Sequence, residues 1–494
     1  MLIFSSNGQN NDIKIVPDFY ELRLDLASKH YYVPIFYYTR KTIITLRNSN
    51  EGGMFNGQKS EKIDFYIKIL NETDFYIDIE LDDILLLYEK IDINMRQRLI
   101  ISIHESSNNN IKLFNLVKEN HFIYDCFFYK IVIMNSSFLD YFALYNNLEQ
   151  LGIKYTLLSS GSTLHFSRIL YKQLGFTATY FGKKGFETSP GQLVEEDVLK
   201  FNILNLNNDT SIGGIIGGKQ ILSSLGLTFY NNYFQNNNKN AVYLPFIIDN
   251  TFELDFFLNK ITSKKQNVKE KRLHNWDNFN FYGFSITMPY KEEITKLLKI
   301  DNKIINLWVP KLNKIYMTDE DAFIKSFIKL QISQKTIIII IGSGAMAKTA
   351  LKILSNNKIY MINRNTISKK NIVNEQRCID ENNSTFNTYI SKINQNIDTN
   401  SSCSELNYKF KDTNNICIIN TTPIGMNMEN FLEVFPLSNF DKVIDLPYTY
   451  SNKTTPLTQF CIDNNIPVVD GIEFWYYQAK QQLEIFLSQI EKLK

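Results

Sequence analysis

Charged residues lie within, or at the ends of, several apolar segments in the first 200 residues. The segments are YELRL (20–24), TIITLR (42–47), FYIDIE (75–80), LIISIH (99–104) and FFYKIVI (127–133), and they carry Glu21, Arg23, Arg47, Glu80, His104 and Lys130. A charge in a strand that is buried on both faces is costly unless something pairs with it. Six such residues on successive segments therefore predict a polar site rather than charges that face water.

Lys130 and His104 are the residues of this set with the most useful chemistry. A lysine amine can attack a ketone, and the resulting iminium ion then acts as an electron sink. The apolar neighbours of Lys130 in sequence favour its neutral, nucleophilic form. His104 can serve as the general base and acid, and Arg23, Arg47 and Arg168 can clamp a carboxylate. A lysine that reaches the surface and a structural core histidine remain the alternatives at this point.

These residues must be positioned by strands that alternate with helices. Two further apolar segments, 155–159 and 177–181, follow the first five, and most gaps between segments are long enough for one helix. Repeated β-α units predict parallel strands, and about eight units close a barrel whose site lies at the carboxyl ends of the strands. The chain before Tyr20 is short for a first strand plus a helix, which predicts a thin wall there.

The first 205 residues resemble the type I 3-dehydroquinate dehydratases. The matching segments are YELRLDL (20–26), TLRNSNEGG (45–53), IDIEL (77–81), ISIHES (101–106), YKIVIM (129–134), FSRI (166–169) and SPGQL (189–193). The resemblance implies that Lys130 forms an imine with the substrate, that His104 transfers protons and that Glu51 orients His104. It also implies substrate-binding roles for Glu21, Arg23, Arg47, Arg168, Thr188 and Gln192, and no cofactor for this half.

A second set of residues points to a nucleotide. TIIIIIGSGAMAKTA (336–350) is an apolar segment that runs into the turn Gly342, Ser343, Gly344, Ala345 and Met346, followed by a helical pattern. Glycines in such a turn let a pyrophosphate approach the helix N-terminus. The next apolar segment ends in Asn363 and Arg364, and an arginine there favours NADP over NAD.

Residues 213–494 resemble the shikimate dehydrogenases. Matching segments include GFSITMPYKE (283–292), MTDEDAF (317–323), IINTTPIGM (418–426), VIDLPYT (443–449) and VVDGIEFWYYQA (468–479). The resemblance pairs Lys291 with Asp319 as catalytic residues and implies NADP(H) as the cofactor. Its implied substrate contacts are Ser224, Thr287, Asn306, Tyr448 and Gln478, and its implied cofactor contacts are the glycine turn with Asn363, Arg364, Leu446 and Gly471. Gly226 stands where the family has a second serine, so one hydrogen bond to the substrate carboxylate is expected to be lost.

Together the two halves predict a bifunctional enzyme of the shikimate pathway. The first half would dehydrate 3-dehydroquinate, and the second would reduce the resulting 3-dehydroshikimate to shikimate with NADPH. The alternative is an active dehydratase fused to a quinate-type or catalytically degenerate, nucleotide-binding dehydrogenase half. The expected domains are a (β/α)8 barrel (1–205), an α/β substrate lobe (211–330), a Rossmann NADP lobe (331–470) and a C-terminal helix that returns to the substrate lobe (471–494).

The composition excludes other classes of function. The formal net charge of +2 provides no basic field for nucleic acid or an anionic membrane. The longest apolar run is too short to span a bilayer. The five cysteines and five histidines show no metal-ligand spacing, so the sequence predicts no metal site and reduced thiols. A cytoplasmic protein is expected, or a plastid protein if a transit peptide is missing from this chain. The sequence leaves the oligomeric state open between monomer and dimer.

Overall fold

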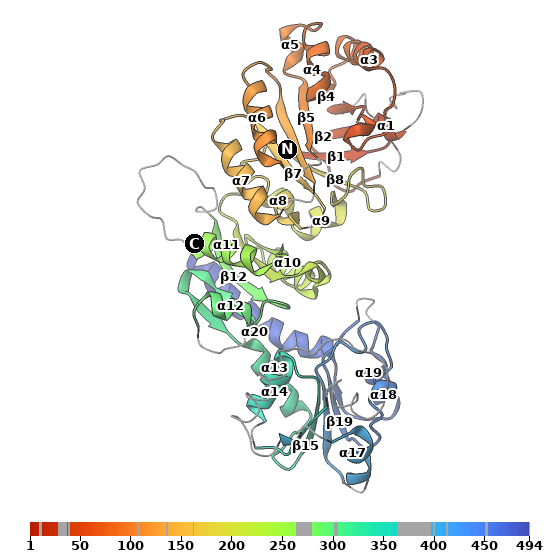
Figure 1. Cartoon of the computed structure of the whole chain (residues 1–494), viewed down its shortest axis with the longest axis vertical. Helices are drawn as coiled ribbons and strands as arrows, with labels where there is room; N and C mark the ends of the chain where they lie inside the picture. Colours follow the sequence, from red (N-terminus) through yellow and green to blue (C-terminus); the bar gives the residue numbers. More distant parts are fainter. Residues whose placement is uncertain are drawn as a thin grey trace. The chain divides into compact units, whose positions relative to one another are not determined.

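The chain folds into two compact units (Figure 1). The computed structural model describes residues 1–8, 12–27, 37, 40–105, 109–134, 137–161, 163–262, 279–300, 305–354, 356–362, 397–398, 401–411, 413–449 and 453–493. The first unit comprises Met1–Tyr290, Val309–Asn313 and Gln489–Lys494, and the second comprises Lys291–Trp308 and Lys314–Ser488.

The first part of unit 1 is a barrel-like sheet of parallel strands. Its strands are β1 (Leu2–Ser6), β2 (Phe19–Arg23), β3 (Thr42–Thr45), β4 (Tyr76–Glu80), β5 (Leu99–Glu105), β6 (Phe128–Met134), β7 (Tyr155–Ser160), β8 (Thr179–Gly182) and β9 (Leu193–Val194). They follow the spatial order β7-β6-β5-β4-β3-β2-β1-β8-β9. The seven strands predicted from the sequence are confirmed, with ends that differ by at most two residues.

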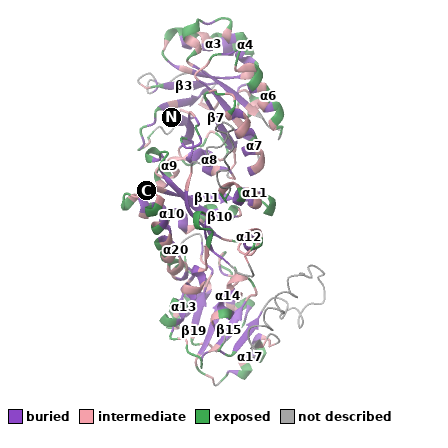
Figure 2. Ribbon diagram, turned by 90° about the vertical axis from the view of Figure 1, so that its left-hand side faces the viewer, coloured by how far each residue is buried: buried purple, intermediate pink, exposed green. Residues whose placement is uncertain are grey.

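The row of strands curves until β7 comes close to the start of β8. The Thr177 N–H donates to the Tyr155 carbonyl (2.9 Å), and the Thr156 hydroxyl donates to the Ala178 carbonyl (3.1 Å). These bonds join the start of β7 to the residues just before β8. The strands are buried while the surrounding helices expose their outer faces (Figure 2), as expected of a sheet that helices cover.

Helices connect most of the barrel strands. They are α1 (Leu24–Ala27), α3 (Lys59–Glu72), α4 (Leu81–Tyr88), α5 (Ile93–Arg96), α6 (Asn110–Asn120), α7 (Phe138–Glu149), α8 (His165–Ile169) and α9 (Glu195–Lys200). Between β1 and β2 the described residues 12–18 form no helix, in line with the predicted thin wall.

Three parallel strands of a smaller, five-stranded sheet lie in unit 1. Strands β10 (Ser211–Gly217), β11 (Ala241–Ile247) and β12 (Asn280–Ile286) pair in the order β11-β10-β12. Helices α10 (Leu225–Asn236) and α11 (Thr251–Thr262) accompany these strands. The Gly213 and Gly214 positions of β10 pack directly against neighbouring atoms, because an added Cβ would meet Tyr282 at 2.3 Å and the Leu244 carbonyl at 2.1 Å.

Unit 2 contains a second parallel sheet, of the Rossmann kind. Its strands lie in the order β17 (Ile397–Asp398), β16 (Ile359–Ile362), β15 (Ile337–Ile341), β18 (Ile416–Asn420), β19 (Lys442–Asp445) and β20 (Val468–Val469). Its remaining elements include α12 (Glu293–Leu297), β14 (Lys314–Tyr316), α13 (Thr318–Lys329), α14 (Ala345–Ile353), α17 (Cys403–Lys409), α18 (Phe431–Val434) and α19 (Pro456–Asp463). Strand β13 (Leu307–Val309) and helix α20 (Gly471–Leu493) include residues of both units.

The isoleucine run of β15 fills cores on both faces of that sheet. Ile338 and Ile340 join a cluster that includes residues of α13 and α14, whereas Ile339 and Ile341 join a cluster that includes residues of α17 and α19. Successive side chains of a strand point to opposite faces, so a continuous apolar run is what a doubly covered strand requires. Among the described residues, no helix is long and apolar enough to cross a membrane.

Candidate active sites

Lys130 lies inside the barrel between two carboxylates. Its Nζ is 3.0 Å from Oε1 of Glu21 on β2 and 2.9 Å from Oδ2 of Asp78 on β4. The same Nζ lies 4.2 Å from the centre of the Tyr180 ring on β8. Lys130 is only 7% exposed, so these three groups form most of the surroundings of its ammonium.

The apolar surroundings that the sequence suggested for Lys130 were therefore wrong. Neighbours in sequence, Tyr129 and Ile131, point to the opposite face of β6 because side chains alternate along a strand. The groups that Lys130 meets come from other strands, and its register partners on β5 and β7 are Ser102 and Thr156. The interior of the barrel at this level is polar, as the six charged residues predicted.

His104 pairs with Glu51, the residue predicted to orient it. His104 Nδ1 lies 2.8 Å from Glu51 Oε2. Burial raises the pKa of Glu51 to about 8, against the opposing charge of Arg47. Burial, followed by the charges of Arg47 and Lys130, lowers the pKa of His104 well below its ordinary value. The imidazole is thus held neutral, the form that a general base needs.

Arg47 is the most enclosed cation next to this pair. Its guanidinium donates to Asp78 Oδ1 (2.7 Å) and to the Ser102 hydroxyl (2.7 Å), and it lies 3.3 Å from Glu80 and 3.7 Å from Glu51. Burial opposes its charge, but Asp78, Glu80 and Glu51 together raise the pKa of Arg47 above its ordinary value. Although burial also opposes the charge of Asp78, Arg47 and Lys130 hold the pKa of that carboxyl well below its usual range.

The other predicted substrate contacts lie on β2, on α8 and in the segment between β8 and β9. Arg23 forms two bonds to Asp25 (2.9 and 2.8 Å) and one to the Thr188 carbonyl (3.2 Å). The Thr188 N–H donates to Gln192 Oε1 (2.8 Å). Arg168 donates through Nε and Nη2 to the Ser159 carbonyl, and burial lowers its pKa to about 10, so it is still a cation at neutral pH. Thr188 Oγ1 also lies 2.7 Å from Ser5 Oγ, which bonds to Glu21.

Sequence reasoning missed Asp78 and Tyr180 as part of this site. Asp78 stands two residues before Glu80 in IDIE, so both carboxylates lie on one face of β4, and this spacing was the available signal. Tyr180 carries no such signal, because a tyrosine in a strand is ordinarily a core residue. Its hydroxyl is fully buried and has no hydrogen-bond partner within the described part of the chain.

Unit 2 contains the second predicted catalytic pair. Lys291 Nζ lies 2.6 Å from Asp319 Oδ2 and 3.7 Å from Met346 Sδ. Asp319 stands in the first turn of α13, where the helix dipole favours an anion, and Met346 stands in the first turn of α14. The lysine side chain is 15% exposed, and the aspartate side chain is 5% exposed. The pairing, which spacing alone did not predict, thus exists in the structure.

Asn306 links this pair to α20. Its Nδ2 donates to the Thr318 hydroxyl (2.8 Å) and to Gln478 Oε1 (3.3 Å), and its Oδ1 accepts from the Thr318 N–H (2.8 Å). Thr318 is the residue before Asp319, so Asn306 also fixes the start of α13. Tyr448 is half-buried beyond the end of β19.

The glycine turn of unit 2 has the features that a dinucleotide requires. Gly342 has φ +109°, and an added Cβ would lie 2.5 Å from the Thr421 hydroxyl, so only glycine fits. A Cβ at Gly344, the residue before α14, would meet nothing within 4 Å, which leaves the helix N-terminus open to a phosphate. Gly471 must also be glycine, since a Cβ there would lie 2.4 Å from the Leu446 carbonyl. Asn363 and Arg364 lie outside the described residues.

Ser224 and Thr287 belong to unit 1. Ser224 is the N-cap of α10, and its hydroxyl accepts the Gly226 N–H at 3.3 Å. Thr287 follows β12, and its methyl group would lie 2.7 Å from a Cβ at Gly217. Both residues therefore stand at the carboxyl ends of the smaller sheet, the end where ligands of open parallel sheets bind.

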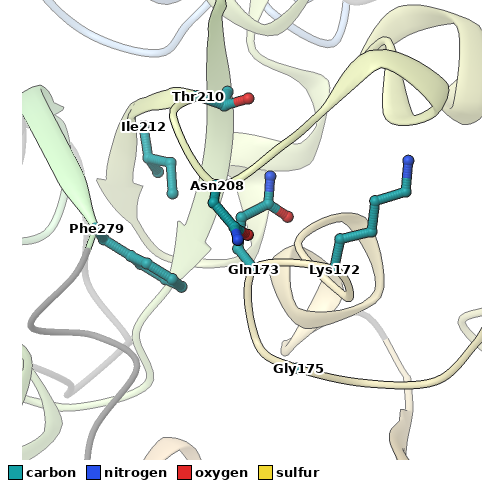
Figure 3. A pocket seen from close by; sticks show the side chains of 7 residues that line it. All are labelled: Lys172, Gln173, Gly175, Asn208, Thr210, Ile212 and Phe279. Atoms are coloured by element: carbon teal, nitrogen blue, oxygen red, sulfur yellow. The ribbon is translucent and has the colours of Figure 1, made fainter. Parts of the chain in front are cut away.

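A cavity of about 360 Å³ lies elsewhere in unit 1, lined by Lys172, Gln173, Gly175, Asn208, Thr210, Ile212 and Phe279 (Figure 3). It contains none of the predicted site residues, because Ile212 and Phe279 stand at the amino ends of β10 and β12. Among the described residues, no cluster of three or more His, Cys, Asp or Glu side chains is arranged to hold a metal.

The geometry defines a chain of two α/β enzyme modules, one centred on a buried lysine in a barrel and one on a lysine–aspartate pair beside a Rossmann sheet. Residues 6–205 match the family model of type I 3-dehydroquinase, and residues 216–304 match that of the shikimate dehydrogenase substrate binding domain. The chain belongs to the shikimate dehydrogenase family, and a type I 3-dehydroquinase domain precedes the family's region in the same polypeptide.

Two relatives carry the name of this family. "Shikimate dehydrogenase (NADP(+))" of Clostridium botulinum (strain Loch Maree / Type A3) is 30% identical over 287 residues, which cover 54% of this chain and 92% of that protein. The Dictyoglomus turgidum protein of the same name is 24% identical over 287 residues, 56% of this chain and 90% of that protein. A solved chorismate mutase/shikimate 5-dehydrogenase fusion protein from Clostridium acetobutylicum is 23% identical and covers 58% of this chain and 96% of its own, with a TM-score of 0.41.

Proposed function

We propose that Lys130 and Lys291 carry the two consecutive reactions of this bifunctional shikimate pathway enzyme. The dehydratase site would convert 3-dehydroquinate to 3-dehydroshikimate, and the dehydrogenase site would reduce the latter to shikimate. The observation that carries the proposal is the contrast between two lysines, one enclosed by carboxylates inside a barrel and one paired with a single aspartate beside a nucleotide turn.

In the first site, Lys130 attacks the substrate ketone after its ammonium proton passes to Glu21, whose Oε1 lies 3.0 Å from Nζ. The carbonyl oxygen leaves as water, and an iminium ion forms. Neutral His104 removes the α-proton, and the electron pair flows into the iminium to give an enamine. His104 then returns its proton to the departing hydroxyl, which leaves as water, and hydrolysis of the imine releases the product and the free lysine.

Positively charged groups around the barrel mouth suit a substrate that carries a carboxylate. Arg23 and Arg168 are buried guanidinium groups that donate mainly to carbonyls and to one aspartate, so each retains donors for an anion. Thr188 and Gln192 lie next to Arg23 and can hold substrate hydroxyls. Glu51 would keep His104 in the orientation that both proton transfers require.

In the second site, Lys291 donates a proton to the ketone oxygen of the substrate, and Asp319 holds the ammonium in position. Bound NADPH would supply the hydride to the carbonyl carbon. Asn306, Gln478, Tyr448, Ser224 and Thr287 would bind the substrate, and the turn from Gly342 to Met346 with Leu446 and Gly471 would bind the cofactor. Asn363 and Arg364 are proposed for the adenosine phosphate. NADP, rather than NAD, is supported by the relatives' names and by the arginine in the sequence.

The test uses the full chain with 3-dehydroquinate and NADPH, and it follows enone absorbance and NADPH loss together. NADPH consumption is expected for the unmodified chain, no enone for Lys130→Ala, and enone accumulation without NADPH loss for Lys291→Ala. If the unmodified chain accumulates enone and leaves NADPH untouched, the proposed second reaction is wrong. The expected four-domain division, the cytoplasmic location and the absence of a resident metal remain predictions.

A further inference from the structure

A buried lysine outside the reacting groups lies at the far end of the charge network of the barrel. Lys62, on α3, is 1% exposed, and its Nζ bonds to Glu80 Oε2, to Asp83 Oδ2 (3.1 Å) and to Asn48 Oδ1 (3.1 Å). Helix α3 runs beside α4, which carries Asp83 (Figure 1). All three donors of the ammonium are therefore used, and none reaches water.

Lysines on the outer helices of a barrel ordinarily extend their ammonium to water. An enclosed lysine must offset its loss of hydration through close anions, and replacing it with an apolar residue leaves those anions unpaired. Lys59 on the same helix shows the ordinary arrangement, because it lies 2.6 Å from Asp83 Oδ1 while its side chain is 56% exposed. Two lysines thus share one aspartate, and only Lys62 is committed to the interior.

The network continues from Lys62 to the reacting lysine through alternating charges. Glu80 Oε1 accepts the Asn48 N–H (2.8 Å) and lies 3.3 Å from Arg47 Nη1. Arg47 Nη2 donates to Asp78 Oδ1, and Asp78 Oδ2 accepts from Lys130. Each anion stands between two cations, so the position of Arg47 depends on the charge of Glu80, and the charge of Glu80 depends on Lys62.

We propose that Lys62 is a positioning residue for the dehydration: its ion pair with Glu80 balances the charge of that carboxylate and thereby holds Arg47 between Glu80 and Asp78, beside the Glu51–His104 pair. The inference rests on the proposed dehydratase reaction and adds to it a residue that touches neither substrate nor the reacting atoms. Arg47 Nη1 is closer to Glu80 (3.3 Å) than to Glu51 (3.7 Å), which is the geometry that Lys62 would maintain.

Replacing Lys62 with methionine leaves Glu80 and Asp83 in one buried site without an ammonium, so one carboxylate must bind a proton. Asp83 retains Lys59 at 2.6 Å and the Asn48 amide at 2.8 Å. Glu80 retains the Asn48 N–H at 2.8 Å, but its one remaining cation is Arg47 at 3.3 Å, which it shares with Asp78. Glu80 therefore takes the proton. Tyr66, also near Glu80, is fully buried and its pKa is raised well above its ordinary value, so it stays neutral and cannot supply a charge.

Protonation of Glu80 would change the pKa of Glu51. The groups that face Glu51 are Arg47, Glu80, Asp82, Asp78 and His104. Burial and then the repulsion from Glu80 and the two aspartates act to raise the pKa of Glu51, and Arg47 acts to lower it. A neutral Glu80 removes one repulsion and frees Arg47 to approach Glu51. Both changes lower the pKa of Glu51 in the variant.

The test measures dehydratase kcat/KM against pH for the full chain, with dehydrogenase activity as the control for folding. The relevant part of the pH profile is the limb near pH 8, which Glu51→Gln is expected to abolish. In Lys62→Met this limb should move to lower pH by roughly one unit, a tenfold change in proton affinity. Lys59→Met, which removes the exposed lysine from the same aspartate, should leave the limb in place.

Glu80→Gln is the second variant, and it should move the limb by itself. Lys62→Met should then have no further effect in the Glu80→Gln background. The double variant also removes the unpaired charge, which keeps the test possible if Lys62→Met alone loses dehydrogenase activity. An unchanged profile in Lys62→Met, or an equal shift by Lys62→Met in the Glu80→Gln background, overturns the proposal. Absence of dehydratase activity from the unmodified chain would instead count against the proposed function itself.

Discussion

The two candidate sites use lysine in different surroundings. The Lys130 side chain is 9% exposed and meets two carboxylates and a tyrosine ring, while the Lys291 side chain is 15% exposed and meets one carboxylate and a thioether. A lysine that forms a covalent imine must lose its ammonium proton and later regain it. A carboxylate beside the ammonium can take that proton, and a second one keeps the lysine in place. A lysine that only donates a proton needs one anion to hold it in place.

The largest expected effect separates the two lysines. Lys130→Ala should lower dehydratase kcat by roughly 10⁴-fold or more, because the variant lacks the amine that forms the imine. Reduction of added 3-dehydroshikimate with NADPH should be unchanged in the same preparation. Retention of dehydratase activity within tenfold would contradict a covalent role for Lys130.

Lys291→Met should have the complementary effect. Loss of the proton donor should lower dehydrogenase kcat by about 10²–10⁴-fold, with dehydratase kcat unaffected. Asp319→Asn keeps the shape of the pair and should give a smaller loss, since the ammonium remains. Steady-state rates of NADPH oxidation check both variants, and equal losses in the two half-reactions would show a folding defect instead.

The two glycines of the nucleotide turn offer a matched comparison. Gly342→Ala combines a positive φ with a close approach to Thr421 and should destabilise unit 2 by about 1–3 kcal/mol. Gly344→Ala meets nothing within 4 Å and should leave the melting temperature unchanged. If a phosphate lies against Gly344, the second variant should still weaken NADPH binding about tenfold in a fluorescence titration. Unchanged affinity would argue against the proposed cofactor position.

The pH dependence of the dehydratase reaction should reflect the His104–Glu51 pair. Because burial lowers the pKa of His104 well below 6.5, the neutral base persists as the pH falls below that value, and dehydratase kcat/KM should decline only at lower pH. A second limb should appear near pH 8, where Glu51 loses its proton, and Glu51→Gln should remove it. An acid limb at or above pH 6.5 would contradict the neutral His104.

The smallest expected effect concerns Gly226. A serine there would restore a donor to the substrate carboxylate, but its Cβ would lie 3.2 Å from Tyr230 and 3.3 Å from Tyr243. The gain of a bond to a charged group, worth about 1.5–3 kcal/mol, should exceed this crowding and lower the KM for shikimate several-fold. An increased KM in Gly226→Ser would show that the two tyrosines have reshaped the pocket around glycine.

Sequence reasoning was strongest where patterns are local. The apolar runs predicted seven of the nine strands of the barrel sheet to within two residues, and the run of β15 with its glycine turn predicted a Rossmann sheet. The surroundings of Lys130 could not be predicted in this way, because Glu21, Asp78 and Tyr180 come from three other strands. The register between strands brings them together, and no spacing along the chain encodes that register.

The pairing of Lys291 with Asp319 shows the same limit. Each residue follows a recognisable segment, but 28 residues separate them, and only the packing of α13 brings them within 2.6 Å. Lys62 is a sharper case, since a lysine on a barrel helix looks like a solvated residue in the sequence. Its proposed role depends on Glu80 and Asp83, which only the fold brings beside it.

The contrast between the lysines is tested most directly by trapping the covalent intermediate. The full chain is incubated with 3-dehydroquinate and borohydride and then digested. The masses of its peptides are measured by mass spectrometry, with Lys130→Ala as the control. A reduced adduct on the peptide that contains Lys130, none on the peptide that contains Lys291, and loss of dehydratase but not dehydrogenase activity are predicted. An adduct on Lys291, or an active dehydratase that yields no adduct on Lys130, would contradict the account.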